Sequence, residues 1–564
     1  MGWTAAARPG PGQDRGLLLL GLALVLCLLV SAVCITAAPL LFHADATHYL
    51  SLGANLSRGL GYRSNQLVFP DLMQPPLYPV LIALLIPLAG SPLSAAITVC
   101  ILCQLLTVVA LWLCHGLLWG DRDRWISAIL GAVSPNIAFG GALLLEPLFV
   151  CTLSLSLYAM LRALRSVSMG WALVAGLGLG LSLLSRPEVV VTGAVLVLLC
   201  LLWPTRPRRR LALAGAVLGG GLLCAIPYGL WMRSQLGFFE VLPKIRYNVP
   251  FADINAHMAW EPDEARLGTR EQRTFFTLMP DRRDFVMNYA FAHPDFDPRP
   301  HFPRTREASR QAQWRAVLWS SRAALWDAIV SVGLLHPLTL ILIVFGLRRG
   351  WRGEAMGFEG EFSLRKQKLL VACLTLLTAL NLGPAMVSGI DYFARYLAAS
   401  ALLSIPLAAG GVHPLAQATT RLRLGRLGVP LWAGLAAVWH LAGTIHAARA
   451  QVSRPEVRER MVAMERLCQK RLPEGARLLA EHPRYAFLRG GYAFQLPYSR
   501  SLSELLDYIR IHHIEYALLD SAVLARNPSR VNRALVDPRA WPPGWTVLEE
   551  ASPGGKPMWL IRLF

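Results

Sequence analysis

Charged residues are scarce in this chain: only 16% of its 564 residues are Asp, Glu, Lys or Arg, whereas 54% are hydrophobic. So little charge among so many apolar residues excludes a disordered or fibrous protein. The apolar residues are gathered in long runs, and the first, from Leu17 to Leu41, holds no charged residue. About 20 apolar residues suffice for a bilayer-spanning helix, so the sequence predicts an integral membrane protein.

The chain also lacks any cysteine pattern typical of a disulfide framework or a metal site. Of its 10 cysteines, only Cys468 stands in a polar segment. We interpret the others as small apolar packing residues. We also find no internal repeat, and no glycine-rich strand-to-helix loop of the kind that binds nucleotide phosphates.

Acidic residues are outnumbered: 35 Asp and Glu stand against 55 Lys and Arg, a formal net charge of +20. In a soluble protein this would suggest nucleic acid as a partner. Here the excess falls in short loops between apolar segments, which is the positive-inside pattern of cytoplasmic loops, so no nucleic-acid partner is predicted. The clusters are Arg122 with Arg124, Arg162 with Arg165, Arg206 with Arg208–Arg210, Arg348 with Arg349 and Arg352, and Arg421 with Arg423 and Arg426.

The apolar runs predict an all-α polytopic membrane protein with about eleven spans. With the N-terminus in the cytoplasm, strict alternation of these spans puts all five arginine clusters on the cytoplasmic side. The predicted spans are roughly 17–39, 93–118, 125–141, 147–163, 171–184, 187–203, 211–231, 326–346, 369–387, 397–415 and 428–448.

The same alternation places the polar segments outside: residues 40–92, an insert at 232–325, a short stretch around Gly389–Tyr396, and the tail. We predict a transmembrane domain over 1–448 and a small extracytoplasmic α/β domain over 449–564. In the tail, Ser501 and Glu504 form a capping-box pattern for a helix through about Ile511. A strand over 514–520 and a final hairpin turning at 552–555 are expected after it.

The first outer segment combines a carboxylate with a proline-rich motif. Asp45 precedes a short amphipathic stretch, 46–58, and is interpreted from the sequence alone as a helix N-cap, which would also hold its carboxylate in a fixed place. The sequence Pro75-Pro76-Leu-Tyr78-Pro79 then opens an apolar stretch to about Leu88 that is short for a span. We predict an interfacial helix there.

These residues, in this order, resemble the GT-C superfamily of membrane glycosyltransferases, near the protein O-mannosyltransferases and aminoarabinose transferases. The resemblance continues through "SPNIAFGGALLLEPLF", which contains Glu146, through "LSRPEVVV", and through "GIDYFARYLAASALLSIPL". It covers roughly residues 15–410. The chain departs from the family in having Gln74 where many relatives carry a basic residue, and its insert is too short for a β-trefoil domain.

The resemblance implies roles for particular residues. Asp45 and Glu146 would be the catalytic carboxylates, with Asp45 as the general base, and both are candidate ligands of a divalent metal. The alternatives from the residues alone stay open: Glu146 as a helix cap, Arg186 and Glu188 as a structural ion pair, and Arg395 as a residue that snorkels to lipid headgroups. The implied substrate-binding residues are Gln74, Tyr78, Arg186, Glu188, Arg395 and Tyr396; Arg63, Lys244 and Arg246 are further candidates for the phosphate, and His43 and His48 for a metal.

The implied function is that of an inverting glycosyltransferase. It would move a sugar from a polyprenyl-phosphate donor to a hydroxyl of a lipid, glycan or protein acceptor, on the outer face of a bacterial inner membrane. Two other classes remain as alternatives: a polytopic transporter, and a non-catalytic cell-envelope assembly protein. A transporter would be expected to carry ionisable sites near the bilayer midplane, whereas the notable ionisable residues here fall at outer helix ends.

Overall fold

The protein is described from a computed structural model. The residues that the structure describes are 11–37, 44–65, 72–121, 123–134, 136–247, 254, 273, 275–302, 337–352, 363–380, 398–419, 427–451, 455–525 and 530–564.

The chain divides into two compact units, each assembled from three separate stretches of sequence. Unit 1 comprises residues 1–40, 96–229 and 319–451. Unit 2 comprises 41–95, 230–318 and 452–564, which are close to the three longer segments predicted to lie outside. This grouping supports the prediction that they share one side of the membrane, because a membrane-spanning bundle would keep segments on opposite sides apart.

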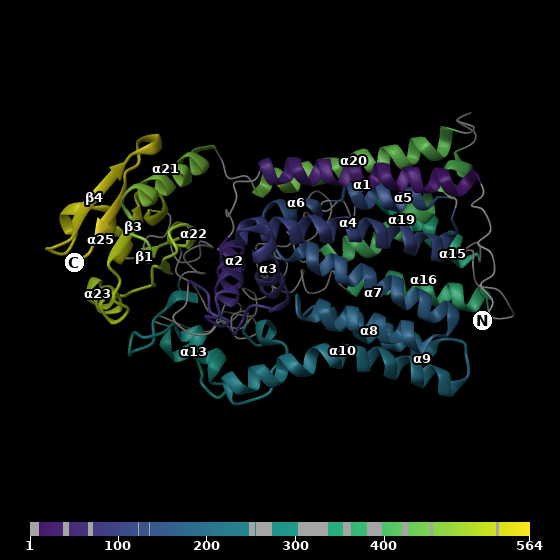
Figure 1. The fold of residues 1–564 in the computed structure, drawn as a ribbon, viewed down its shortest axis with the longest axis horizontal. Helices are drawn as coiled ribbons and strands as arrows, with labels where there is room; N and C mark the ends of the chain where they lie inside the picture. Colours follow the sequence, from purple (N-terminus) through teal and green to yellow (C-terminus); the bar gives the residue numbers. More distant parts are fainter. Residues whose placement is uncertain are drawn as a thin grey trace, which may run out of the picture. The chain divides into compact units, whose positions relative to one another are not determined.

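Unit 1 is a bundle of apolar helices (Figure 1). Long runs of Leu, Val and Ala without interior charge favour helices that satisfy all their own backbone hydrogen bonds, as a bilayer requires. Within the bundle α1 packs on α5 and α6, α7 on α8, and α15 on α19. Its helices are α1 (Pro11–Ala37), most of α4 (Pro92–Trp119), α5 (Arg124–Ala132), α6 (Asn136–Gly141), α7 (Glu146–Ser166), α8 (Met169–Leu183), α9 (Val189–Leu202), most of α10 (Pro207–Leu236), α15 (Pro337–Trp351), α16 (Ser363–Leu380), α19 (Ala398–Ala418) and α20 (Gly428–Gln451).

The polytopic helical fold class is confirmed: this is an integral, multi-pass membrane protein. By length and composition, five helices in the described part of the chain can cross a bilayer: Arg15–Thr36, Pro92–Trp119, Glu146–Ser166, Pro207–Leu236 and Gly428–His446. Leu18, Leu29 and Val33 of α1 are largely exposed, as expected of side chains that face lipid. The number of spans, about eleven, stays a prediction.

One predicted span differs in the structure. Residues 125–141 form two helices, α5 and α6, instead of one. Pro135 follows Ser134 in the sequence, and a residue that precedes proline is disfavoured from helical geometry. The break is explained by Pro135, whose effect on the helix is not seen when the span is predicted from hydropathy alone.

Unit 2 begins with two helices of the first outer segment, α2 (Ala44–Ser57) and α3 (Leu77–Ala89), which pack on each other. The insert contributes α13 (Val286–Ala292) and the short helix η1 (Arg299–His301). Both helices of the first segment lie close to their predicted positions. Whether α3 lies in the membrane interface stays a prediction.

The tail forms a five-stranded sheet with strand order β2-β1-β3-β5-β4. Strands β1 (Arg477–Ala480), β2 (Tyr492–Phe494) and β3 (Tyr516–Asp520) are parallel. The hairpin of β4 (Thr546–Ala551) and β5 (Met558–Arg562) joins β3 in antiparallel fashion. The other elements of the tail are α21 (Pro455–Arg471), α22 (Arg484–Phe487), α23 (Leu502–Ile511), α24 (Ser521–Leu524), α25 (Arg530–Val536), η4 (Pro538–Ala540) and η5 (Pro553–Gly555).

Side chains alternate between the two faces of this sheet, as the two-residue repeat of a strand requires. Ala517 and Leu519 lie in the core on the side of α23 and α25, together with Phe285 of the insert. Leu518 lies in the opposite core, with Met464 of α21. Helices therefore cover both faces, and the domain is the small α/β unit expected from the sequence.

Several details predicted for the tail are confirmed. The Ser501 side chain accepts a hydrogen bond from the Glu504 backbone N–H at 3.3 Å, and α23 ends at Ile511 as expected. The final hairpin turns at 553–555. Strands β1 and β2 were not predicted, because they are very short and lack the alternating pattern that marks a half-exposed strand.

Direct contacts join the three stretches of unit 2. The Asn65 carbonyl accepts a hydrogen bond of 2.6 Å from the Ala493 N–H, on the edge of β2. Arg282 of the insert forms an ion pair with Asp507 of α23. Unit 2 therefore contains more than the tail, and the predicted division into 1–448 and 449–564 stays a prediction.

Candidate active site

One group of predicted site residues, in unit 1, lies at one end of the α7–α8 helix pair. Gly178 of α8 faces Ser156 of α7 so closely that a Cβ on Gly178 would lie 2.8 Å from the Ser156 Cβ. Two hydroxyl hydrogen bonds also cross this contact, from Ser156 to the Ala175 carbonyl at 2.7 Å and from Ser182 to Thr152 at 2.8 Å. Small and hydroxyl residues are the usual means of bringing membrane helices close together. The packing fixes the end of α8 beside the start of α7.

That packing brings three predicted site residues together. Glu146 is the first residue of α7 and is 0% exposed. Arg186, in the turn between α8 and α9, forms an ion pair with the Glu146 carboxylate through Nη2. Its Nη1 lies 3.5 Å from Glu188 Oε1. The cluster thus contains two carboxylates and one guanidinium.

The backbone before Glu146 has an unusual conformation. Leu143 has a φ of 55°, which is uncommon for a bulky residue. Leu144 and Leu145 that follow it are buried. Such conformations persist only where the surrounding packing determines them. The loop therefore holds the start of α7, and the Glu146 carboxylate with it, in one position.

A separate group of predicted site residues lies at the start of α2 in unit 2. Asp45 lies in the first turn of α2, where its negative charge complements the helix dipole, and it is half-buried. The loop after α2 folds back on it: the Asn55 side chain donates to the Arg63 carbonyl at 2.7 Å, and the Asn65 N–H donates to Ser51 Oγ at 3.2 Å. The helix that carries Asp45 is thus held along much of its length.

Packing of α2 against α3 accounts for Tyr78. The rings of Tyr49 and Tyr78 meet edge to face with centroids 5.5 Å apart, and Tyr78 is only 2% exposed. Such a ring pair is favoured over a stacked sandwich and stabilises the contact. Tyr49 lies one helical turn after Asp45, so the structure favours a role for Tyr78 in positioning this part of α2. Contact of Tyr78 with a substrate stays a prediction.

Gly53 marks the closest approach of α2 and α3. A Cβ there would lie 2.6 Å from Ile82 Cγ2 and 3.2 Å from the Pro79 carbonyl oxygen. We expect Gly53→Ala to force the helices apart, lowering the free energy of unfolding by about 1–3 kcal/mol and reducing activity. Thermal unfolding and a turnover assay would measure both effects. Gly21→Ala in α1, where nothing lies within 4 Å of the new Cβ, is the control and should not destabilise; equal effects of the two changes would contradict this account.

The remaining predicted residues are placed as follows. Gln74 is half-buried, and its backbone carbonyl accepts a hydrogen bond of 3.0 Å from the Tyr62 hydroxyl. Arg63 is exposed, and Arg246 lies 3.6 Å from Glu240. Three residues lie outside the described part of the chain: His43, Arg395 and Tyr396.

Residues 73–231 match the family of dolichyl-phosphate-mannose-protein mannosyltransferases. Among solved structures, the chain resembles ArnT from Cupriavidus metallidurans bound to undecaprenyl phosphate, with a TM-score of 0.56 and 13% identity over 96% of this chain and 97% of that one. It also resembles the oligosaccharyltransferase AglB from Archaeoglobus fulgidus, in complex with an inhibitory peptide and a dolichol-phosphate: TM-score 0.55, 11% identity, 92% and 73% coverage. The chain has the GT-C fold. No curated protein matches it significantly.

The GT-C resemblance predicted from the sequence motifs is therefore confirmed for the fold. The family match includes Gln74, Tyr78, Glu146, Arg186 and Glu188, whereas Asp45 precedes it. At this level of identity the likeness establishes the architecture, and the role of each residue stays a prediction.

The structure gives Glu146 a guanidinium as its partner instead of a divalent metal. The Arg186 guanidinium contacts Glu146 Oε1 directly, so this carboxylate oxygen already has a cationic partner. In the part of the chain that the structure describes, no three His, Cys, Asp or Glu side chains gather closely enough to hold a metal ion. We therefore derive no catalytic step through a metal.

Proposed function

We propose that the chain is an inverting glycosyltransferase that transfers a sugar from a polyprenyl-phosphate donor to an acceptor hydroxyl. The observation that carries the proposal is a fold shared along almost the whole chain with ArnT, solved with undecaprenyl phosphate. AglB, solved with a dolichol-phosphate, shares the fold as well. Nothing comparable supports a transporter or an assembly protein.

In this proposal Asp45 is the general base. The acceptor hydroxyl must lose its proton as its oxygen bonds to the anomeric carbon, and a fixed carboxylate can take that proton. Asp45 meets the requirement for fixity because α2 is fastened by the Tyr49–Tyr78 contact and by the loop that folds back on it. The bond from the anomeric carbon to the lipid phosphate breaks on the opposite face of the sugar, and the phosphate leaves with the bonding electrons.

The cluster of Glu146, Arg186 and Glu188 suits the sugar better than the phosphate. Its two carboxylates outnumber its one guanidinium, so the cluster as a whole is negative and would repel a phosphate. Glu188 Oε2 is buried and has no hydrogen-bond partner within the described residues. A sugar hydroxyl donating to it would satisfy that acceptor. We therefore propose that this cluster binds hydroxyls of the transferred sugar.

The leaving phosphate requires positive charge from elsewhere. Departing phosphate is stabilised by preorganised cations more than by a general acid. Arg395, with Tyr396 beside it, remains our first candidate on the resemblance, followed by Arg63 and Lys244. Arg246 is a weaker candidate because its guanidinium lies near Glu240 and over the Phe238 ring.

The donor is the most direct test of the function. The purified protein in liposomes should be offered polyprenyl-phosphate sugars and nucleotide sugars separately, each with membrane-extracted acceptors. Product should form, and free polyprenyl phosphate should be released, only with the lipid-linked donors. Turnover of a nucleotide sugar without any lipid carrier would overturn the proposal.

We also propose that unit 2 faces outward from a bacterial inner membrane. The five arginine clusters support this orientation through the positive-inside rule. Single cysteines replacing Ser57, Asp295 and Glu550, all exposed residues of unit 2, should react with an impermeant maleimide on intact cells. A cysteine at Arg208 should react only after permeabilisation. The opposite labelling pattern at any one site would defeat the proposed topology.

A further inference from the structure

The parallel part of the C-terminal sheet has a point where neighbouring connections run in opposite directions. From β1 the chain passes through α22 to β2 on one side, and from β2 through α23 to β3 on the other side of β1. Ligands of open α/β sheets bind in the crevice beyond the carboxyl ends of strands at such a switch point. In this domain that place lies between Glu481, directly after β1, and Asp520, at the end of β3.

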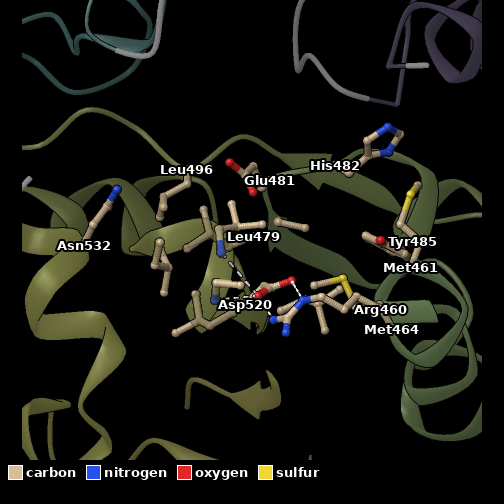
Figure 2. Close-up of a pocket in the computed structure, with 16 residues that line it drawn as sticks. Arg460, Met461, Met464, Leu479, Glu481, His482, Tyr485, Leu496, Asp520 and Asn532 are labelled. Carbon is tan, nitrogen blue, oxygen red and sulfur yellow. Dashed lines mark hydrogen bonds and ion pairs between the residues drawn. The ribbon is translucent and has the colours of Figure 1, made fainter. Parts of the chain in front are cut away.

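A cavity of about 230 Å³ occupies this position. For comparison, an engineered cavity of about 150 Å³ takes up benzene. Most of its wall is aliphatic or methionine side chains, including Met461 and Met464 of α21, Leu479 and Leu496 (Figure 2). Flexible thioethers adapt to ligands of irregular shape. The body of a ligand that fits here is therefore apolar and about the size of one ring.

The charged groups in the wall disfavour an anionic ligand. Arg460 is the only Lys or Arg among the lining residues, and it is already engaged. Its Nε and Nη2 bind the Asp520 carboxylate, and its Nη1 donates to the Pro553 and Lys556 carbonyls at 3.2 and 3.3 Å. Asp520 Oδ1 also accepts the Ala522 N–H at 2.8 Å. The Arg460–Asp520 pair thus makes its hydrogen bonds within the protein and does not attract an anionic ligand.

The polar groups after the end of β1 favour a ligand group that donates a hydrogen bond. Glu481 is exposed at the cavity, and a carboxylate has about four lone-pair positions, so it can accept a further hydrogen bond beside those it makes. His482 Nδ1 accepts the Arg484 N–H at 3.3 Å, which leaves the proton of the neutral ring on Nε2. Burial raises the pKa of the neighbouring Tyr485 phenol, so that group stays uncharged. Figure 2 shows Glu481 and His482 away from the Arg460–Asp520 pair.

We propose that this cavity binds a primary amine that carries a single apolar group. The ammonium lies against Glu481 at the mouth, where the lining has one more carboxylate than cations, and the apolar group lies among the methionine and leucine side chains. This site is distinct from the candidate sugar-transfer residues, and the proposal does not depend on the transferase activity.

The test uses the whole protein in nanodiscs and three matched probes: 4-fluorobenzylamine, 4-fluorobenzyl alcohol and 4-fluorobenzoate. Ligand-observed ¹⁹F NMR, corrected with empty nanodiscs, should show binding in the order amine, alcohol, benzoate. Glu481→Gln should weaken amine binding by about three- to fivefold, as expected of a solvent-exposed ion pair, and leave the alcohol unchanged. Glu550→Gln, an exposed glutamate of β4 outside the lining, is the matched control and should change neither.

A second variant tests the cavity itself. Ala522→Leu places a larger side chain in the wall and should weaken all binding by tenfold or more. Thermal unfolding of each variant shows whether the domain remains folded, and Glu481→Gln keeps the test decisive if Ala522→Leu does not fold. Equal binding of benzoate and amine, or amine binding that neither variant reduces, would overturn the proposal. Both results would leave the proposed transferase function untouched.

Discussion

Replacing Asp45 by Asn should reduce sugar transfer by at least about a hundredfold, since general-base catalysis contributes roughly 10²–10⁴ in rate. The side chains have nearly the same shape, and Asn also serves well near a helix start, so α2 should still form. The change therefore isolates the ability to accept a proton. Turnover of a polyprenyl-phosphate sugar, measured beside thermal unfolding, separates loss of catalysis from loss of fold.

Asp295→Asn is the matched control, because Asp295 is an exposed aspartate of the same unit. It should keep wild-type turnover. If Asp45→Asn retained turnover within a few fold of wild type, Asp45 would be only a residue that stabilises the start of α2. If the variant lost its fold, the charge of Asp45 would be required for the helix itself.

The Glu146–Arg186 pair predicts a second large effect, on stability. Arg186→Met leaves Glu146 fully buried without its guanidinium partner, with Glu188 nearby. Breaking a buried ion pair from one side costs about 3–5 kcal/mol, whereas replacing both partners is often neutral. We expect Arg186→Met to express poorly and unfold at a much lower temperature. Glu146→Gln should destabilise less, because Arg186 keeps Glu188.

The double variant Glu146→Gln with Arg186→Met separates the two roles of the pair. We expect it to recover most of the stability lost in Arg186→Met, yet to remain inactive, because the acceptors proposed for the sugar are altered. The coupling energy from the double-mutant cycle measures the interaction directly. If the stability losses were simply additive, the ion pair would contribute little; if the double variant were active, the cluster would have no role in catalysis.

The sequence predicts the elements better than their contacts. Charge-free runs of 20 residues or more predict α1 and α4 directly, and the capping-box residues Ser501 and Glu504 predict the start of α23. Pro135 was misjudged because it lies within an apolar run long enough to be taken for one span. Strands β1 and β2 escape prediction because they are only a few residues long and show no clear alternation of buried and exposed residues.

The candidate site shows the same limit. The sequence indicates Arg186 and Glu188 as a pair across a turn, and they do approach to 3.5 Å. It gives no sign that Arg186 contacts Glu146, 40 residues away, because that contact depends on how α7 and α8 pack. Side chains such as Ser156 and Ser182 determine this packing through their hydrogen bonds. The sequence does not reveal which residue such a hydroxyl will bond.

The bond between Asn65 and Ala493 has a consequence for biosynthesis. Asn65 is synthesised long before Ala493 of β2, its hydrogen-bond partner. During that interval α2 can be held by α3 and by the loop that folds back on it, whereas the strand edge that Asn65 contacts has not yet formed. The segment with α2 and α3 can therefore fold locally before synthesis reaches the sheet, and its contact with β2 is made afterwards.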